Sequence, residues 1–260
     1  MTDSKVAIVT GAAGGLGEGI TRRLGRDGVK VVGTGRNEGK LSALSAALDG
    51  TMDFAHVAVD LSAQDAPKAI VDAALDRFGR LDMVINNAGS FNFGPVDQTT
   101  DDMLDEVLGI SLRAPFRLCR EAIPHMGEGS SIVFIGSTWG LYGTAGGGAY
   151  SAVKAGQIGL MQTLAAEYGR RGIRSNYVAP TVVKTEMTEA YWDVDFFKRI
   201  NFELTPLAGF CQIEDVANMV GFLCSDEARF VHGQTIAVDG GISSTRFVDP
   251  AAIAAERVSP

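Results

Sequence analysis

A short apolar run, a glycine-rich turn and a helical pattern follow one another at the start of the chain, and this succession restricts the fold more than any other feature. The run spans Lys5 to Thr10, the turn reads Gly-Ala-Ala-Gly-Gly-Leu-Gly from Gly11 to Gly17, and the helical pattern extends from Glu18 to Arg26. Runs of this kind form buried parallel strands. Glycines let backbone N–H groups approach a pyrophosphate, and the positive end of the helix dipole faces the same point. The segment therefore predicts a dinucleotide-binding turn, although a tight strand–helix turn without a ligand has the same pattern.

The alternation of strand and helix continues through the chain. Further strand-like runs lie at 29–34, 54–59, 81–85, 131–135, 173–178 and 234–238, and helical patterns lie at 40–48, 63–78, 100–118, 149–171 and 213–224. Alternation of this kind predicts an α/β fold, a parallel sheet covered by helices on both faces. We expect one nucleotide-binding and catalytic domain over 1–245, with a lid at about 181–207 and a C-terminal tail over 246–260.

Composition and charge exclude several classes of function. The net charge is −8, so we expect no nucleic-acid partner. No apolar run is long enough to cross a membrane, and the first residues lead directly into a strand, so we expect neither a spanning helix nor a signal peptide. The three cysteines are scattered and odd in number, which favours reduced thiols and a cytoplasmic location. No spacing of histidine and cysteine is typical of zinc ligands, so we expect no metal site.

Three side chains in the middle of the chain suggest proton transfer. Tyr150 and Lys154 are four residues apart, which places them on one face of a helix. A lysine ammonium beside a phenol favours the phenolate, so we expect the pKa of Tyr150 to fall below its usual value of about 10. Ser137 follows a predicted strand, and its hydroxyl is suited to hold a substrate oxygen beside the tyrosine. The constellation predicts acid–base chemistry on a carbonyl or alcohol oxygen, whereas the tyrosine–lysine pair alone is also typical of an exposed helix surface.

The ends of the next strands indicate which cofactor binds. In an NAD-binding unit an acidic residue ends the second strand, but here Gly35 and Arg36 occupy that position. A guanidinium pairs well with a 2′-phosphate, so NADP(H) is favoured over NAD(H), although Glu38 is close by and an exposed arginine is the alternative. Asp60 is placed to accept a hydrogen bond from an adenine amino group, or else to begin the following helix. Asn87 suits a loop under a cofactor and equally an ordinary turn.

The ordered set of motifs resembles the short-chain dehydrogenase/reductase family along nearly the whole chain, in particular its 3-oxoacyl reductase-like and secondary-alcohol dehydrogenase members. The matching segments are Thr10 to Gly17, Asp60, Asn86 to Gly89, Ser137, Tyr150 with Lys154, Asn176 with Pro180, and Val238 to Gly241. The resemblance implies a Rossmann-type, doubly wound sheet of seven parallel strands and a homotetramer or homodimer. It implies that Tyr150 is the catalytic acid and base, that Lys154 binds the nicotinamide ribose, and that Ser137 orients the substrate.

The motifs and the resemblance together give a set of expected cofactor-binding residues. They are Gly11, Gly15, Leu16, Gly17, Arg36, Asp60, Leu61, Asn87, Gly89, Tyr150, Lys154, Pro180, Val183 and Thr185. Two positions depart from the family pattern. Ser111 stands where the family usually has an asparagine that holds a water behind the lysine, so Ser111 is expected in the catalytic proton relay. Thr181 stands where family members often have glycine after the proline.

Aromatic residues in the loops at the expected mouth of the site indicate the substrate. The expected substrate-binding residues are Phe91, Phe93, Trp139, Tyr142, Thr181, Met187, Tyr191 and Trp192. Such a set favours an apolar or ring-containing ketone or secondary alcohol, while packing of the lid on the domain is the alternative for any one of them. We therefore expect an NAD(P)(H)-dependent oxidoreductase that interconverts a ketone and a secondary alcohol. A 3-oxoacyl-thioester reductase is the alternative substrate class, and a non-catalytic nucleotide sensor is the alternative of another kind.

Overall fold

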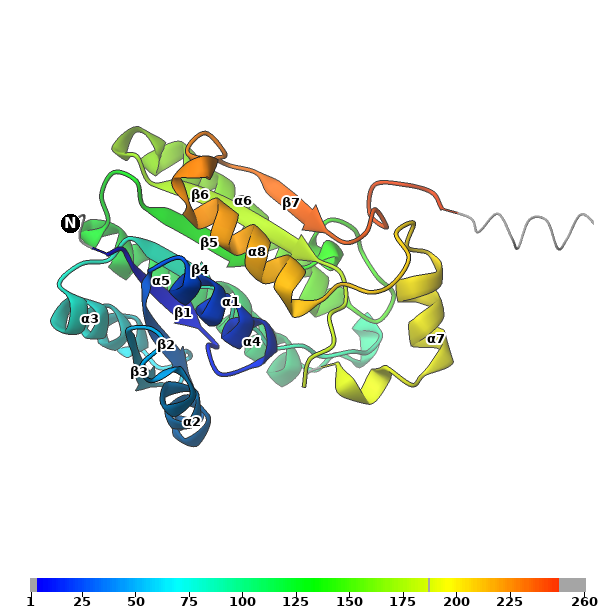
Figure 1. Ribbon diagram of the computed structural model, residues 1–260. Helices are drawn as coiled ribbons and strands as arrows, with labels where there is room; N and C mark the ends of the chain where they lie inside the picture. Colours follow the sequence, from blue (N-terminus) through cyan, green and yellow to red (C-terminus); the bar gives the residue numbers. More distant parts are fainter. Residues whose placement is uncertain (1–3, 187, 248–260) are drawn as a thin grey trace, which may run out of the picture.

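The computed structural model describes residues 4–186 and 188–247. Its centre is a seven-stranded sheet in the order β3-β2-β1-β4-β5-β6-β7, with every neighbouring pair parallel (Figure 1). The strands are β1 (Val6–Thr10), β2 (Lys30–Gly35), β3 (Phe54–Ala58), β4 (Met83–Asn86), β5 (Ser131–Ile135), β6 (Arg174–Pro180) and β7 (Thr235–Val238). The predicted doubly wound parallel sheet of seven strands is confirmed.

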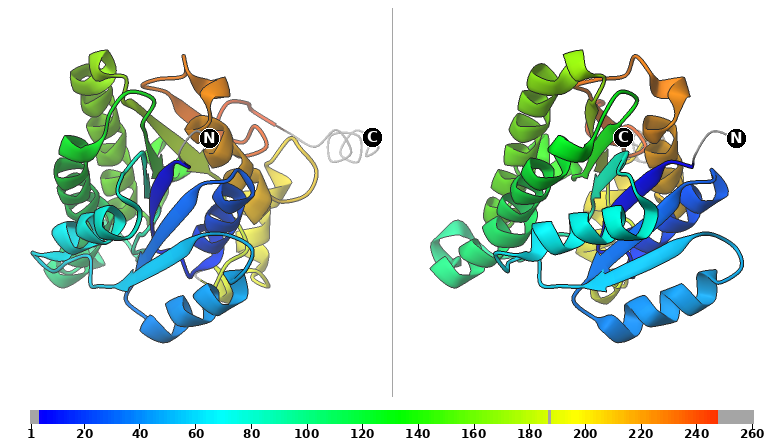
Figure 2. Two further views of the ribbon diagram at one scale, coloured as in Figure 1. Left: turned by 60° about the vertical axis from the view of Figure 1, so that its left-hand side comes forward. Right: turned by 90° about the vertical axis from the view of Figure 1, so that its left-hand side faces the viewer.

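Helices cover both faces of the sheet (Figure 2). One layer contains α1, α2 and α8, and the other contains α3, α4, α5 and α6. Their bounds are α1 (Gly15–Arg26), α2 (Glu38–Leu48), α3 (Ala66–Phe78), α4 (Asp101–Leu108), α5 (Ala114–Ala122), α6 (Gly148–Tyr168) and α8 (Ile213–Cys224). The central strands are therefore buried on both sides, as their continuous apolar runs predict.

Two apolar cores result from the alternation of side chains along each strand. In β1, Val6 and Ile8 belong to the core under α3, α5 and α6, whereas Ala7 and Val9 belong to the core under α1, α2 and α8. All four side chains are fully buried. Successive strand residues point to opposite faces, so one five-residue strand contributes to both cores.

The region from 100 to 122 differs from the single helix that its pattern predicts. The helix α4 begins after Thr100, whose side chain accepts a hydrogen bond from the Met103 N–H. It then passes through a π-helical turn, η2 (Gly109–Arg113), before α5 begins. Such turns insert one extra residue and are frequent at functional sites. The π turn contains Ser111, one of the two positions at which the chain departs from the expected pattern.

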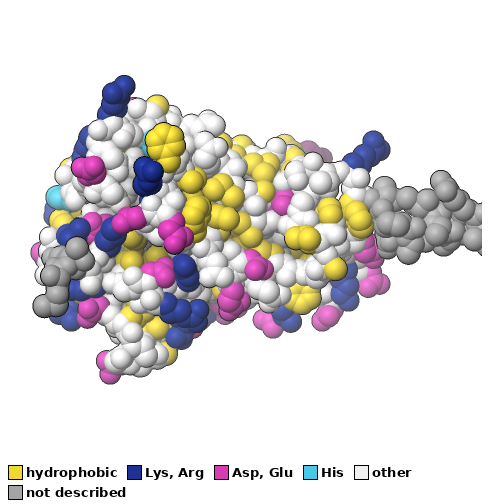
Figure 3. Space-filling view, turned by 45° about the horizontal axis from the view of Figure 1, so that its top comes forward, with side chains coloured by type: hydrophobic (Ala, Val, Ile, Leu, Met, Phe, Trp, Pro, Cys, Tyr) yellow, Lys and Arg dark blue, Asp and Glu magenta, His cyan; other side chains and the backbone are white. Residues whose placement is uncertain are grey.

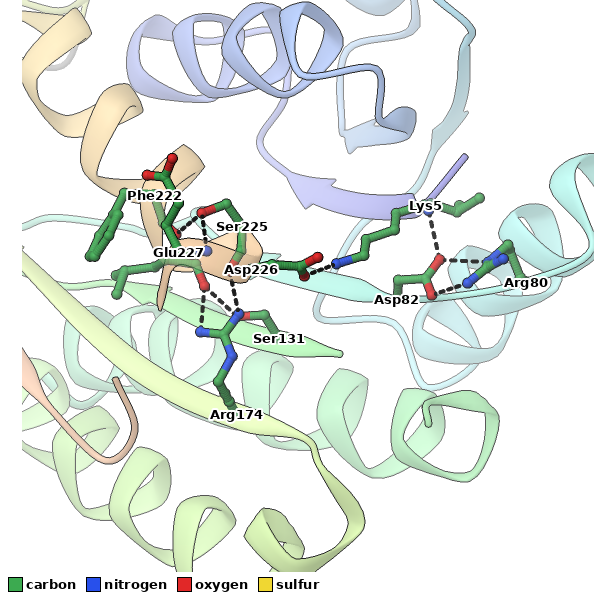
Figure 4. Close-up of polar contacts among 11 residues, drawn as sticks. Lys5, Arg80, Asp82, Ser131, Arg174, Phe222, Ser225, Asp226 and Glu227 are labelled. Atoms are coloured by element: carbon green, nitrogen blue, oxygen red, sulfur yellow. Dashed lines mark hydrogen bonds and ion pairs between the residues drawn. The ribbon is translucent and has the colours of Figure 1, made fainter. Parts of the chain in front are cut away.

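A polar cluster joins the elements at the amino ends of the strands, the edge opposite the glycine turn (Figure 4). Arg174, the first residue of β6, is buried, and its guanidinium donates to the carbonyl oxygens of Leu223 (2.6 Å) and Ser225 (3.2 Å). These carbonyls lie at the end of α8, where helical partners run out. A buried cation therefore satisfies the helix terminus and ties it to the sheet.

Asp82 forms the second part of this cluster, directly before β4. Its carboxylate accepts the backbone N–H of Val6 at 2.8 Å and two guanidinium hydrogen bonds from Arg80 at 2.7 and 2.9 Å. One carboxylate thus connects the starts of β1 and β4. Both parts of the cluster hold the amino ends of strands in place. They lie at the edge of the sheet opposite the glycine turn and so take no part in that turn.

The segment expected as a lid consists of short helical pieces and turns between β6 and α8. They are η6 (Glu189–Tyr191), α7 (Asp195–Lys198) and the π turn η7 (Arg199–Glu203). Within the described residues, no helix is long and apolar enough to cross a membrane. The tail expected over 246–260 lies outside the described residues except for its first two positions.

Replacing Arg174 with methionine should lower the free energy of unfolding by about 2–3 kcal/mol, because two charge-assisted hydrogen bonds disappear and buried carbonyl groups lose their donors. Urea unfolding would measure the change. Arg170→Met, at an exposed arginine of the neighbouring turn, is the matched control and should change stability by less than about 0.5 kcal/mol. Equal effects of the two substitutions would contradict the assigned role.

Candidate active site

A cavity of about 600 Å³ opens at the carboxyl ends of the strands. It runs from the glycine turn, across the end of β2, to the start of α6. Expected cofactor residues in its lining are Gly11, Gly15, Leu16, Arg36, Leu61, Asn87, Gly89, Tyr150, Lys154 and Thr185. The topology that brings them together is the reversal of strand order between β1 and β4, the place where open α/β sheets bind ligands.

The glycine turn has the local structure that a phosphate group requires. Gly11 has a φ of +67°, and a Cβ at Gly17 would lie 2.0 Å from the Gly11 carbonyl oxygen, so neither position tolerates a side chain without distortion. Gly17 therefore packs the turn against α1. The residue before α1, Gly14, provides no side-chain cap, and Gly14, Gly15 and Leu16 line the cavity. The uncapped helix terminus fits the pyrophosphate of a dinucleotide.

The far end of the cavity is lined by Gly35, Arg36, Val59 and Leu61. Asp60 is not part of the lining. Its carboxylate accepts hydrogen bonds from the backbone N–H (2.9 Å) and the hydroxyl (2.8 Å) of Ser62, and these bonds hold the pKa of Asp60 below its ordinary value. The structure thus places Asp60 in the turn before α3, beside the position expected to receive adenine.

Asn87 organises the floor of the cavity through the backbone of a different strand. Its side-chain amide donates to the carbonyl oxygens of Thr10 (2.9 Å) and Gly11 (3.3 Å), and its backbone N–H donates to the Thr10 hydroxyl (2.9 Å). These bonds couple the end of β4 to the start of the glycine turn. Gly89 follows, and a Cβ there would lie 3.6 Å from Ser111 Oγ and 3.7 Å from Lys154 Nζ.

Lys154 carries its amino group into the interior at the end of β5. The residue is 3% exposed, and Nζ donates to the carbonyl oxygen of Ile135 at 2.9 Å. Burial disfavours the ammonium and lowers the pKa of Lys154 to about 8. The side chain therefore changes charge close to physiological pH.

The ring of Tyr150 is enclosed by two other aromatic rings. Phe91 lies edge-on at a centroid distance of 5.1 Å, and Trp139 lies edge-on at 5.9 Å. Burial raises the pKa of Tyr150 to about 12, and a hydrogen bond with the Ser137 hydroxyl opposes this rise. The sequence-based expectation of a lowered pKa is wrong for the folded chain, because loss of hydration outweighs the hydrogen bond with Ser137, and Lys154, whose Nζ lies 5.5 Å from the ring centroid, does not reverse the shift.

Ser137 stands between β5 and the short turn η4 (Thr138–Gly140). Its hydroxyl accepts the backbone N–H of Trp139 at 3.1 Å and shares a hydrogen bond with Tyr150. The structure thus brings the hydroxyls of Ser137 and Tyr150 together. Tyr150 lines both the larger cavity, with Lys154, and a smaller one, with Ser137. A carbonyl oxygen at these two hydroxyls would meet one proton donor and one further hydrogen-bond donor.

Ser111, in the π turn η2, is fully buried and lies near Lys154, since a Cβ at Gly89 would contact both Ser111 Oγ and Lys154 Nζ. Its hydroxyl oxygen accepts the backbone N–H of Ser90 at 3.2 Å. Its carbonyl oxygen accepts a hydrogen bond from the Gln157 side chain on α6. The π turn therefore places a short hydroxyl side chain near the lysine, where it holds the backbone of Ser90.

A second cavity of about 260 Å³ adjoins the first. The expected residues that line it are Phe91, Phe93, Ser137, Trp139, Tyr150, Pro180, Thr181, Val183, Thr185 and Tyr191. Tyr150, Phe91, Leu16, Gly136 and Thr185 belong to both cavities. The described lining of the second cavity contains no charged side chain.

Two expected substrate residues, Trp192 and Tyr142, do not reach this lining in the structure. Trp192 packs instead against the rings of Phe202 and Phe210, with distances between ring centroids of 5.0 Å and 5.2 Å. Its indole N–H donates a hydrogen bond to the Thr188 hydroxyl. Tyr142 is 38% exposed on the outer side of the loop after η4. Met187 lies outside the described residues.

Several lining residues escape the sequence analysis. Glu106 of α4 lines the larger cavity and accepts a 2.6 Å hydrogen bond from the Ser90 hydroxyl. Glu186, beside Arg36 in the same lining, forms an ion pair with Lys40 of α2 at 2.7 Å. Val194, Phe197 and Asn201 complete the lid side of the smaller cavity. No local pattern marks Glu106 or Glu186, because the partner of each belongs to another segment of the chain.

Comparison with known proteins identifies the family. Residues 11–243 match the family model described as Enoyl-(Acyl carrier protein) reductase. A short-chain dehydrogenase from Burkholderia cenocepacia, solved in complex with NADP, superposes with a TM-score of 0.87 at 32% identity, covering 92% of this chain and 98% of that one. This chain is a short-chain dehydrogenase/reductase.

Relatives include the 3-oxoacyl-(acyl-carrier-protein) reductase of Thermotoga maritima, 32% identical over 92% of this chain and 98% of its own length. Another is (+)-borneol dehydrogenase 2 of Salvia officinalis, 37% identical over 93% and 90%. Family membership makes it an NAD(P)-dependent oxidoreductase.

The buried lysine predicts a specific dependence of stability on pH. The pKa of Lys154 falls from 10.5 to about 8 on folding. Between these values the unfolded chain holds a proton that the folded chain has released, so this residue makes stability rise with pH, by about 2 kcal/mol from pH 8 to pH 10. In Lys154→Met that contribution should be absent, which urea unfolding at a series of pH values would show.

The matched control for this measurement is Lys198→Met, at an exposed lysine of α7, which should keep the wild-type slope. Parallel stability profiles for the wild type and Lys154→Met would show that the ammonium is not desolvated.

Proposed function

We propose that this dehydrogenase/reductase interconverts a compact apolar ketone and the corresponding secondary alcohol. The observation that carries the proposal is the position of Tyr150, whose ring lines both the cofactor-sized cavity and the apolar cavity. The Tyr150 hydroxyl stands where the two cavities meet and is paired with the Ser137 hydroxyl. The substrate oxygen needs a proton donor at this point. We propose residues 1–245 as the single domain that performs this reaction.

Tyr150, Ser137 and Lys154 have separate roles in the proposed reaction. When bound, the nicotinamide ring supplies or accepts the hydride. Tyr150 donates a proton to the substrate oxygen in reduction and removes it in oxidation, while the Ser137 hydroxyl donates a hydrogen bond to the same oxygen. Because burial keeps the pKa of Tyr150 at about 12, the phenol is protonated at neutral pH and ready to act as an acid. The charge of Lys154 below pH 8 favours the phenolate that proton donation leaves behind.

The smaller cavity favours a ring-containing ketone over a carrier-bound thioester. Its volume of about 260 Å³ lies below the usual range of ligand pockets, and its described lining is mainly aromatic and aliphatic. A phosphate or carboxylate would find no cation there. The relative named for borneol, a compact cyclic alcohol, supports this reading. A 3-oxoacyl thioester is the second candidate, supported by the Thermotoga maritima relative, and its carrier would have to remain outside the cavity.

We propose NADP(H) as the preferred cofactor. Arg36 lines the cavity at the end of β2, where NAD-binding units carry an acidic side chain. Lys40, four residues further along in α2, is paired with Glu186, so the preference rests on Arg36. The solved relative with bound NADP supports the same preference.

We further propose a homotetramer or homodimer located in the cytoplasm. The edge strand β7 is only partly buried, and Phe230, just before it, is 91% exposed. Figure 3 shows hydrophobic side chains gathered in the middle of one face with charged side chains around them. Exposed apolar area of this kind is typical of subunit contacts. The three free thiols support a reducing compartment.

The activity itself is tested by absorbance of the reduced nicotinamide with cyclohexanone, a bicyclic terpenoid ketone and acetoacetyl-CoA as substrates. We expect turnover with the ring ketones, and we expect Tyr150→Phe to lower it by about 10²–10⁴-fold because the proton donor is lost. Tyr168→Phe, at the far end of α6, is the control and should keep wild-type turnover. Full activity of Tyr150→Phe would refute the assignment, and turnover of the thioester alone would favour the second substrate class.

The cofactor preference is tested at position 36. Arg36→Leu should weaken NADP(H) binding by about 10- to 100-fold and leave NAD(H) nearly unchanged, because a charge-assisted hydrogen bond to the 2′-phosphate is removed. Titration of cofactor fluorescence gives both dissociation constants. Arg26→Leu, at an exposed arginine ending α1, should change neither. An equal loss for both cofactors at position 36 would contradict the preference.

A further inference from the structure

We propose that Tyr177 is a positioning residue for catalysis, whose buried hydroxyl holds the Ser137 backbone and thereby aims the Ser137 side chain. The inference rests on the proposed function, in which the Ser137 hydroxyl donates to the substrate oxygen. It assigns a task to a residue that the family motifs leave unexplained.

The first support is the pair of hydrogen bonds that one hydroxyl makes. The Ser137 N–H donates to the Tyr177 hydroxyl oxygen at 2.9 Å, and that hydroxyl donates to the Ser137 carbonyl oxygen at 3.3 Å. Ser137 has φ −163° and ψ 155°, a fully extended backbone. In that conformation the N–H and C=O of one residue point to the same side, so one hydroxyl can bridge them. The bridge fixes the backbone from which the Ser137 side chain projects.

The second support is the space made for the tyrosine ring. Tyr177 of β6 is fully buried, and a Cβ at Gly136 would lie 1.7 Å from its Cζ atom. A Cβ at Gly140 would lie 2.7 Å from its hydroxyl oxygen and 2.9 Å from the backbone carbon of Lys154. The glycines on both sides of Ser137 therefore admit the ring beneath it. Any side chain at either position would displace the ring or the turn.

The third support is the need for such a constraint at this point of the chain. Ser137 follows the last residue pair of β5 and β6, so the sheet no longer holds it. Its hydroxyl must meet Tyr150 on α6, an element that begins eleven residues later. Burial raises the pKa of Tyr177 far above its ordinary value, so its hydroxyl keeps its proton throughout the working range. A neutral hydroxyl both donates and accepts, so Tyr177 can keep both hydrogen bonds to the Ser137 backbone.

A double-mutant cycle separates positioning from general stability. Tyr177→Phe keeps the ring in its space and should lower kcat by roughly tenfold, with the cofactor dissociation constant unchanged. In a Ser137→Ala background the same substitution should have little further effect on kcat, because the group that it positions is absent. Single-turnover measurement with enzyme in excess extends the cycle to slow variants. The matched control is Tyr168→Phe, which removes a phenol hydroxyl elsewhere and should leave kcat unchanged in both backgrounds.

A second measurement does not depend on activity. Hydrogen exchange at the Ser137 amide should become faster in Tyr177→Phe and stay at the wild-type rate in Tyr168→Phe. Unchanged exchange at this amide, an unchanged kcat, or an equal loss in the wild-type and Ser137→Ala backgrounds would each overturn the inference. Absence of turnover in the wild type would instead count against the proposed function, and the exchange measurement would still decide whether the Tyr177 hydroxyl holds the Ser137 backbone.

Discussion

The site depends on restricting the hydration of two ionisable side chains, since Lys154 is buried and Tyr150 is only partly exposed. One backbone carbonyl, that of Ile135, holds the lysine amino group, and two aromatic rings enclose the tyrosine. Burial of ionisable groups is costly, so they stay in place only where the surrounding structure is rigid. Here the end of β5, the start of α6 and the hydroxyl of Tyr177 provide that rigidity. The polar cluster at the opposite edge of the sheet stabilises the scaffold without entering the chemistry.

The fold can be predicted from the sequence because the decisive patterns are local. The run over 131–135 coincides with β5, and the glycine turn leads into α1 as the positive φ of Gly11 requires. The interruption between α4 and α5 could not be predicted, because a π turn adds one residue without altering the apolar pattern around it. What periodicity cannot reveal is a change in helical pitch.

The candidate site is predictable in part for the same reason. Ser137, Tyr150 and Lys154 are recognisable by spacing, and the structure places them around two adjoining cavities, both of which Tyr150 lines. The direction of the pKa shift of Tyr150 is not recognisable, because it depends on Phe91 and Trp139, which approach from other segments. The same limit applies to Tyr177, whose partner lies 40 residues away in sequence. Aromatic residues in a lid do not reveal which of them point inward.

The ion pair of Lys40 with Glu186 joins α2 to the segment that follows β6. Both side chains are largely exposed, so the attraction between them weakens as salt concentration rises. If the proposed cofactor preference and lid are correct, a single contact links both. Substitutions in α2 that remove Lys40 will therefore also release Glu186, and rates measured at different ionic strengths will compare different strengths of this contact.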